Sequence, residues 1–249
     1  MSKEIYIYGI HPVIEAIKSG KELEKVFIQA GLNSDRVNEL KKLLYANKIT
    51  PRIVPAEKLN RLAPKANQGV VAIISQIQYC EIEMLVPHIY EKGEQPFLLV
   101  VDRITDVRNF GAIARTASCA GVHAIIFPEK GSAMINAQTI KASAGAINII
   151  PICRTINLKK TLQFLKESGI KLIACTEKAV TEYTSVNYDD PIAIIVGSEE
   201  NGISPDILKY ADYKVRIPIK GSIESLNVSV ASAIVIYEVV RQRTGNLIK

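Results

Sequence analysis

The stretch FLLVVDRITDVRNFGAIART, residues 97–116, determines the fold class that we expect for this chain. It opens with five consecutive apolar residues, and such a run predicts a strand that is covered on both faces, as in parallel sheets. The largely polar segment from Asp102 to Asn109 then leads into a helix that we expect to begin at Phe110. A buried strand, a polar loop and a helix in this order form the repeating unit of an α/β fold with a parallel sheet.

The same unit recurs towards the C-terminus. A last strand over 213–219 leads into a predicted helix over 225–243, which is apolar on several sides. Such a helix needs more than one surface to bury it, so we expect it to pack on the sheet and at a subunit interface. Four further strands are predicted between the first and the last, over residues 124–127, 147–152, 171–175 and 192–196.

The first 80 residues differ from this pattern and predict a small mixed α/β module. Its elements are a strand over 26–30, a helix over 34–47 and strands over 53–54 and 69–74. The irregular stretch that follows is expected to be a linker or a short connecting helix. The predicted domains are therefore residues 1–78, a linker over 79–95, and residues 96–249.

Charge divides the chain in the same way. Of its 249 residues, the first 80 hold 12 basic and 7 acidic side chains, whereas the rest hold 19 and 18. With 48% hydrophobic and 22% charged residues, the composition excludes a disordered, collagenous or disulfide-rich chain. The four cysteines have no zinc-site spacing, and we expect reduced thiols. No apolar run is long enough for a membrane helix and the start lacks a signal-peptide core, so we expect a cytoplasmic protein.

Three polar segments follow predicted strands, at residues 102–116, 197–202 and 218–229. Ligands of parallel α/β sheets bind beyond the carboxyl ends of the strands, so these segments are the candidate site. Each also has a plain structural interpretation: Asn109 or Ser225 could cap a helix, and Arg115 could be a solvated surface side chain. The coincidence of three polar loops at one end of three strands favours a functional site.

Common nucleotide and metal motifs are absent from the sequence. It contains no Gly-x-Gly, which excludes the dinucleotide fingerprint, and in GSEENGIS the residue Ile203 stands where a phosphate-binding loop needs lysine. The three widely spaced histidines support neither a metal site nor a catalytic triad, and we expect His123 to be structural. We therefore expect no metal.

Three segments together resemble a known family. In this order, NFGAIARTA (109–117), IVGSEENGIS (195–204) and IPIKGSIESLNVSVA (217–231) are similar to the signature motifs of the SpoU family of S-adenosylmethionine-dependent RNA 2'-O-ribose methyltransferases. The opening YGIHPVIEAI (8–17) resembles the substrate-binding domain of its 23S rRNA guanosine methyltransferase branch, the RlmB type. One departure is Val107, where the family commonly has proline, and it bears on the shape of the loop.

The resemblance implies a fold and a set of site residues. The fold would be a SPOUT-type, trefoil-knotted parallel-sheet methyltransferase domain, preceded by a small ribosomal protein L30e-like α/β domain that binds RNA. The cofactor would be S-adenosyl-L-methionine, held by the backbone near Thr176, Gly197, Ile217 and Leu226. The polar active site, shared across a homodimer, would consist of Asn109, Arg115, Glu199, Ser225 and Asn227.

The implied reaction is methyl transfer to a ribose 2'-hydroxyl, with a guanosine of the 23S rRNA peptidyl-transferase loop as the expected target. A tRNA ribose methyltransferase and a non-catalytic RNA-binding protein on the same scaffold remain alternatives. Neither DNA nor a membrane is an expected partner. The role of Arg115 stays open between accepting the proton and acting as a charged clamp, since a guanidinium is charged at pH 7.

Overall fold

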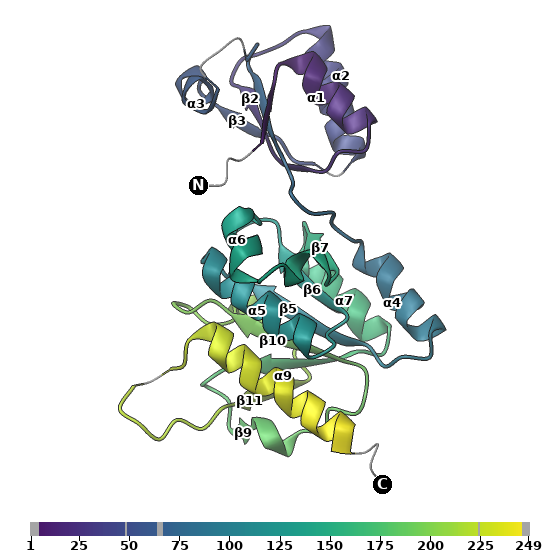
Figure 1. The fold of residues 1–249 in the computed structure, drawn as a ribbon, viewed down its shortest axis with the longest axis vertical. Helices are drawn as coiled ribbons and strands as arrows, with labels where there is room; N and C mark the ends of the chain where they lie inside the picture. The colour runs from purple at the N-terminus through teal and green to yellow at the C-terminus, as the bar shows by residue number, and fades with distance from the viewer. Residues whose placement is uncertain (1–4, 48, 64–66, 224, 246–249) are drawn as a thin grey trace. The chain divides into compact units, whose positions relative to one another are not determined.

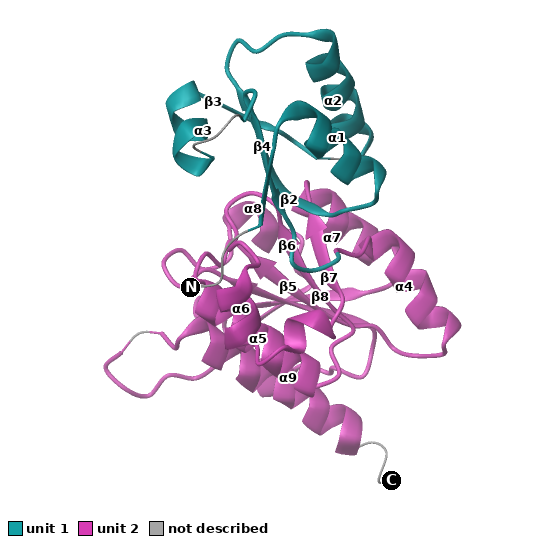
Figure 2. Ribbon diagram, turned by 45° about the horizontal axis from the view of Figure 1, so that its top comes forward, with its two compact units in different colours: residues 1–78 teal, residues 79–249 magenta. Residues whose placement is uncertain are grey.

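The computed structural model describes residues 5–47, 49–63, 67–223 and 225–245 (Figure 1). By their internal contacts, residues 1–78 and residues 79–249 form two compact units (Figure 2). In the described part of the chain, no helix combines the length and the apolar character that a membrane span requires.

The first unit is a mixed α/β module, as its sequence predicts. Its four-stranded sheet has the order β1-β4-β2-β3, in which β4 runs antiparallel to both of its neighbours and β3 runs parallel to β2. Side chains of α1 and α2, among them Val13, Leu40 and Leu44, form the core with the sheet. The elements are β1 (Tyr6–Tyr8), α1 (Ile10–Lys18), β2 (Leu23–Gln29), α2 (Asp35–Ala46), β3 (Arg52–Val54), α3 (Ala56–Leu62) and β4 (Val70–Ile74).

The second unit is built on a seven-stranded sheet in which every paired strand is parallel. The strand order is β7-β6-β5-β10-β8-β11-β9. Its strands are β5 (Phe97–Asp102), β6 (Ala124–Pro128), β7 (Ile152–Thr155), β8 (Lys171–Cys175), β9 (Thr181–Glu182), β10 (Ile192–Gly197) and β11 (Tyr213–Arg216). Its helices are α4 (Ile82–Glu91), α5 (Val107–Cys119), α6 (Ala137–Ala142), α7 (Leu158–Glu167), α8 (Pro205–Leu208) and α9 (Val228–Gly245), with 3-10 turns η1 (Ala146–Asn148) and η2 (Tyr183–Ser185).

Helices cover both faces of this sheet, which explains the uninterrupted apolar strands. All six residues of β5 and all six of β10 are buried. One face packs with α4, α7 and α8 in a single apolar cluster. The other is covered by α5, with α6 and α9 in contact with it (Figure 1). The parallel, doubly covered sheet expected from the sequence is confirmed.

The segment 79–95, expected as a linker or short connecting helix, contains the helix α4. Ile82, Val86 and Ile89 of this helix are buried in the apolar cluster of the second unit. The helix is therefore part of the core of that unit.

Several predicted boundaries differ from the structure. The helix α5 begins at Val107, three residues before the predicted Phe110, and β2 begins at Leu23, three residues before the predicted strand. The strand predicted over 147–152 is wrong in its first half, because those residues form η1 and a turn in which Ile149 is 79% exposed. The last strand, β11, ends at Arg216 instead of reaching residue 219. The helix predicted from Ser225 begins three residues later, at Val228.

Candidate active site

The polar segments that follow the strands lie at one edge of the sheet. Since β5, β10, β8 and β11 are parallel neighbours, their carboxyl ends point the same way. Asn109 lies in the first turn of the helix that follows β5, and Glu199 lies in the loop after β10. Asn227 directly precedes α9, which follows β11.

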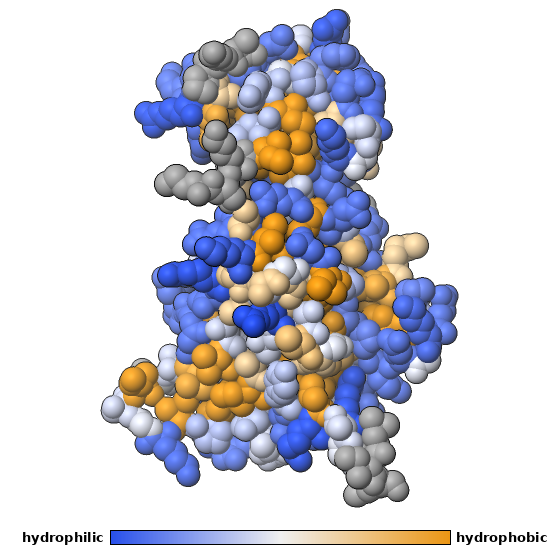
Figure 3. Space-filling view, in the orientation of Figure 1, coloured by the Kyte–Doolittle hydropathy of each residue, from blue (hydrophilic) through white to orange (hydrophobic). Residues whose placement is uncertain are grey.

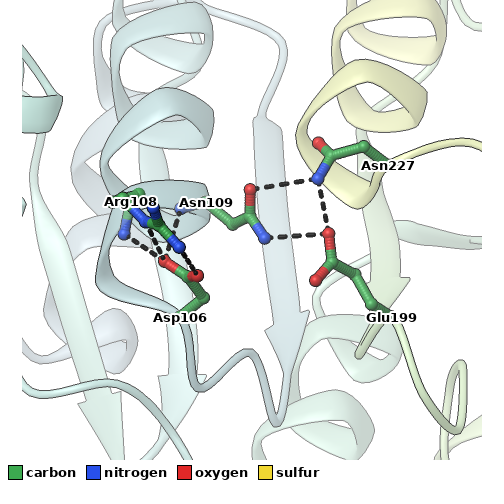
Figure 4. A network of polar contacts seen from close by, with 5 residues as sticks. All are labelled: Asp106, Arg108, Asn109, Glu199 and Asn227. Atoms are coloured by element: carbon green, nitrogen blue, oxygen red, sulfur yellow. Dashed lines mark hydrogen bonds and ion pairs between the residues drawn. The ribbon is translucent and has the colours of Figure 1, made fainter.

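Side chains from all three segments meet in a cluster of Asn109, Glu199 and Asn227, here named the polar cluster (Figure 4). Glu199 Oε1 accepts hydrogen bonds from Asn109 Nδ2 at 2.8 Å and from Asn227 Nδ2 at 2.5 Å. Asn227 Nδ2 also donates to Asn109 Oδ1 at 3.2 Å. Two amide donors thus fix one carboxylate oxygen, so the direction of the other is set as well.

Asp106, not Asn109, caps the helix α5. Its Oδ1 accepts from the backbone N–H of Arg108 at 2.6 Å and of Asn109 at 3.4 Å. The side chain of Arg108 also donates to this carboxylate, and the hydrogen bond holds the pKa of Asp106 below its usual range. The capping interpretation of Asn109 is therefore wrong, and its amide is free to bind Glu199.

Asn227, not Ser225, caps the helix α9. Its Oδ1 accepts from the backbone N–H of Ser229 at 2.9 Å, while its Nδ2 donates to Glu199. One side chain thus ends the preceding loop and orients the carboxylate. Ser225 and Leu226 stand outside the helix and are exposed, and no hydrogen bond of Ser225 is recorded among the described residues.

The loop that carries Glu199 is closed on itself. Ser198 N donates to Gly202 O at 3.1 Å, and Gly202 N donates to Ser198 O at 2.9 Å. A Cβ at Gly197 would overlap the backbone of Gly202 and Ile203, so only glycine fits at the end of β10. The tight turn holds the backbone of Glu199 in one place.

Arg115 does not join the polar cluster within one chain. It is exposed on α5, and no polar partner of its side chain is recorded in the described part of the chain. It lies six residues after Asn109, which on a helix is about 240° around the axis. The two side chains therefore leave α5 in different directions.

The backbone positions expected to hold a cofactor lie on neighbouring strands. Gly197 ends β10, Thr176 follows β8, and Ile217 follows β11, in the order in which these strands stand in the sheet. Thr176 N donates to Val215 O at 2.8 Å, which ties the ends of β8 and β11 together. Leu226 directly precedes Asn227, a member of the polar cluster, and is 38% exposed.

A cavity of about 250 Å³ opens beside the polar cluster, and part of its lining was not predicted. Asn109 and Glu199 contribute to its wall. Most of the other lining residues, which the sequence analysis did not name individually, are polar or charged and come from the same loops: Arg103, Thr105, Asp106, Ser198, Glu200 and Asn201. Their position directly after β5 and β10 was the available signal. Ile104, Gly131 and Val228 complete the wall. Among the described residues, no three His, Cys, Asp or Glu side chains are placed to share a metal ion.

Comparison with models of protein families shows to which family the chain belongs. The family model of the SpoU rRNA methylase family matches residues 96–237, which is more than half of the chain. The chain belongs to the SpoU family. A second model, for the substrate-binding domain of RNA 2'-O ribose methyltransferases, matches residues 6–80.

Individual SpoU relatives match over about two thirds of the chain or more. The Bacillus subtilis protein YacO, named for the TrmH family of tRNA/rRNA methyltransferases, is 34% identical over 238 residues, with 96% of each chain covered. The SpoU methyltransferase AviRb of Streptomyces viridochromogenes, solved in complex with AdoMet, has the same fold, with a TM-score of 0.62 at 22% identity over 97% of this chain and 91% of that one. A TrmH/SpoU tRNA modifying enzyme of A. aeolicus is 31% identical, with a TM-score of 0.57 over 66% of this chain and 85% of that one.

Proposed function

We propose that this SpoU chain transfers a methyl group from S-adenosylmethionine to a ribose 2'-hydroxyl in RNA. The observation that carries the proposal is the polar cluster, in which residues from three motifs that resemble the SpoU signatures meet at the carboxyl edge of the parallel sheet. Such a cluster has the groups needed to orient a hydroxyl.

The residues at the sheet edge fit the proposed cofactor. Gly197 lets the backbone turn back on itself where a side chain would obstruct it, which leaves backbone groups near the ends of β10, β8 and β11 to hold a ligand. Half-buried Ile217 and exposed Leu226 offer apolar surface to an adenine ring. The cofactor would supply an activated methyl group on a positively charged sulfur.

The chain itself would bind and orient the ribose. Glu199 Oε2 has no recorded donor among the described residues, so it is available to accept a hydrogen bond from a ribose hydroxyl. The adjoining cavity is lined by three carboxylates, those of Asp106, Glu199 and Glu200, and by one cation, Arg103. This balance suits the hydroxyl and amino groups of a nucleoside better than a phosphate.

The exposed Arg115 and the apolar surface of α9 favour a homodimer. Apolar side chains gather over α9 and the segment before it, as Figure 3 shows, and Val230 and Tyr237 of α9 are 47% and 50% exposed. Burial of this surface against a second copy of the chain would explain a helix that is apolar on several sides. The exposed Arg115 would then complete the active site of the other protomer, as a proton acceptor or as a charged clamp, and Ser225 would add a hydroxyl. For the path of the chain, we propose that the segments around β11 and α9 form a trefoil knot.

The basic first unit would gather the RNA. Its excess of 12 basic over 7 acidic side chains in the first 80 residues supplies salt-sensitive attraction to phosphates. We assign residues 1–78 to RNA capture on an L30e-like fold and residues 96–249 to catalysis, with the connecting segment 79–95 contributing α4 to the core of the second unit. As the target we propose a guanosine of the 23S rRNA peptidyl-transferase loop, methylated in the cytoplasm.

The test is methyl transfer by the full chain to purified 23S rRNA and to tRNA in separate reactions. We expect labelled methyl groups in rRNA, at a guanosine 2'-oxygen after nuclease mapping. Glu199→Gln should lower the rate, because the amide removes the free carboxylate oxygen while it preserves the hydrogen bonds of Oε1. Transfer to tRNA alone would replace the proposed target, and no transfer to either RNA together with no S-adenosylmethionine binding would favour the non-catalytic alternative.

A further inference from the structure

Arg103 has an unusual backbone conformation for a residue with a side chain. Its φ is 58°, in the left-handed region that glycine adopts without strain. Strained residues of this kind concentrate at functional sites, where surrounding interactions hold them in place. Arg103 lies directly after β5 and lines the cavity beside the polar cluster.

The interactions of Arg103 reach across to the loop that carries Glu199. Its Nη2 donates to Gly202 O at 3.4 Å. Its Nε lies 3.4 Å from Asp102 Oδ1 and forms an ion pair with that carboxylate. The contact does not have hydrogen-bond geometry, and the buried Nε has no hydrogen-bond acceptor among the described residues. The guanidinium therefore connects the end of β5 with the closed turn after β10.

Asp102 completes this connection. Its side chain is only 3% exposed, and its Oδ2 accepts the backbone N–H of Ser204 at 2.7 Å. Asp102 and Arg103 thus bind both Ser204 and Gly202, at the end of the turn that holds Glu199. Because Gly202 and Ser198 pair with each other through their backbones, a shift of Gly202 shifts the turn as a whole.

We propose that Arg103, supported by Asp102, is a positioning residue that holds Glu199 in place for the reaction. This inference rests on the proposed function, because it assigns the turn a role in methyl transfer. Arg103 acts through Gly202 on the backbone of Glu199, whose Oε1 then meets Asn109 and Asn227.

The test compares Arg103→Ala and Arg103→Lys in the full chain with 23S rRNA as substrate. We expect Arg103→Ala to lower kcat about 10- to 100-fold, the range for a small misplacement of a catalytic group. Affinity for S-adenosylmethionine, measured by calorimetry, should change less than about threefold, because Thr176, Ile217 and Leu226 of the proposed cofactor site lie outside the turn. Arg103→Lys, which retains one cationic donor, should restore part of kcat.

The matched control is Lys92→Ala, which removes one exposed cation before β5, at the opposite end of that strand from the site. It should leave kcat unchanged. The inference would be overturned if kcat of Arg103→Ala were within twofold of kcat of Lys92→Ala. It would also be overturned if kcat of Arg103→Lys were no higher than kcat of Arg103→Ala.

A second readout does not depend on activity. Hydrogen exchange of the amides of Gly202 and Ser204, which are bonded to Ser198 O and to Asp102, should become faster in Arg103→Ala, while exchange within β5 and β10 stays slow. Unchanged exchange at both amides would overturn the inference even if the rate falls. If the wild-type chain methylates no RNA, the proposed function fails, and faster exchange in Arg103→Ala would then show a structural connection without a role in methyl transfer, which also overturns the inference.

Discussion

Replacement of Asn227 separates the two roles of its side chain. Oδ1 caps α9 through the N–H of Ser229 at 2.9 Å, and Nδ2 donates to Glu199 Oε1 at 2.5 Å. Loss of an N-cap costs about 1 kcal/mol, and loss of an exposed hydrogen bond to a charged group costs about 1 kcal/mol more. We therefore expect Asn227→Ala to lower the free energy of unfolding by about 2 kcal/mol, and Asn227→Ser, whose hydroxyl can still cap the helix, by about 1 kcal/mol.

Thermal unfolding followed by circular dichroism measures this difference. In a chain of this size, 1 kcal/mol corresponds to about 2–4 °C in Tm, so the expected losses are about 4–8 °C for alanine and about 2–4 °C for serine. Methyl transfer should fall in both variants, since each removes the donor to Glu199. Asn227→Asp keeps the cap but places a second carboxylate beside Glu199, so its transfer rate should be the lowest of the three.

Two results would refute this reasoning. Equal losses of Tm in Asn227→Ser and Asn227→Ala would show that the cap contributes nothing to stability. Unchanged methyl transfer in Asn227→Ser would show that the hydrogen bond to Glu199 has no part in the reaction.

Three further predictions concern the turn after β10, the thiols and the start of α5. Gly197→Ala should lower the free energy of unfolding by about 1–3 kcal/mol in urea, because its Cβ overlaps backbone, whereas Gly221→Ala, with open space around it, should not. Near neutral pH, iodoacetamide should label the exposed thiols of Cys80 and Cys119, as peptide mass spectrometry would show. It should spare Cys153 and Cys175, because burial raises their pKa values to about 12 and about 11. Hydrogen bonds from Arg108 lower the pKa of Asp106 in the folded state. The stabilisation by this carboxylate is therefore complete above the usual carboxyl pKa and is lost as pH falls through the lowered value. The difference in Tm between the wild type and Asp106→Asn should accordingly disappear in acid.

Strands buried on both faces were the most predictable part of the fold. The strand predicted over 171–175 agrees with β8 at both ends, because a continuous apolar run bounded by polar residues leaves little choice. The run 147–152 misled the same reasoning: its first isoleucines form η1 and a turn after Gly145, whose φ is 85°. A short apolar run has no periodicity that separates these outcomes, and the exposed two-residue strand β9 has no apolar signal at all.

The candidate site was predictable as a set of loops but not as a set of contacts. Asn109 and Glu199 meet because β5 and β10 are neighbours in the sheet, and this order is a long-range property of the fold. Sequence likewise does not show whether Asn227 or Ser225 caps the last helix, since both residue types are good caps. The left-handed backbone of Arg103 has no sequence signature, which is why that residue was not singled out.

The strand order also determines when the polar cluster can assemble during folding. Asn227 is 28 residues from Glu199 but 118 residues from Asn109. Closing the longer loop costs about 1.2 kcal/mol more in chain entropy, since the separation is about two doublings greater. The Glu199 and Asn227 pair can therefore form early and locally, while Asn109 joins only when β5 docks beside β10. Enzyme activity then reports completion of the slow, non-local step of folding, and a chain arrested before Asn227 contains no assembled cluster.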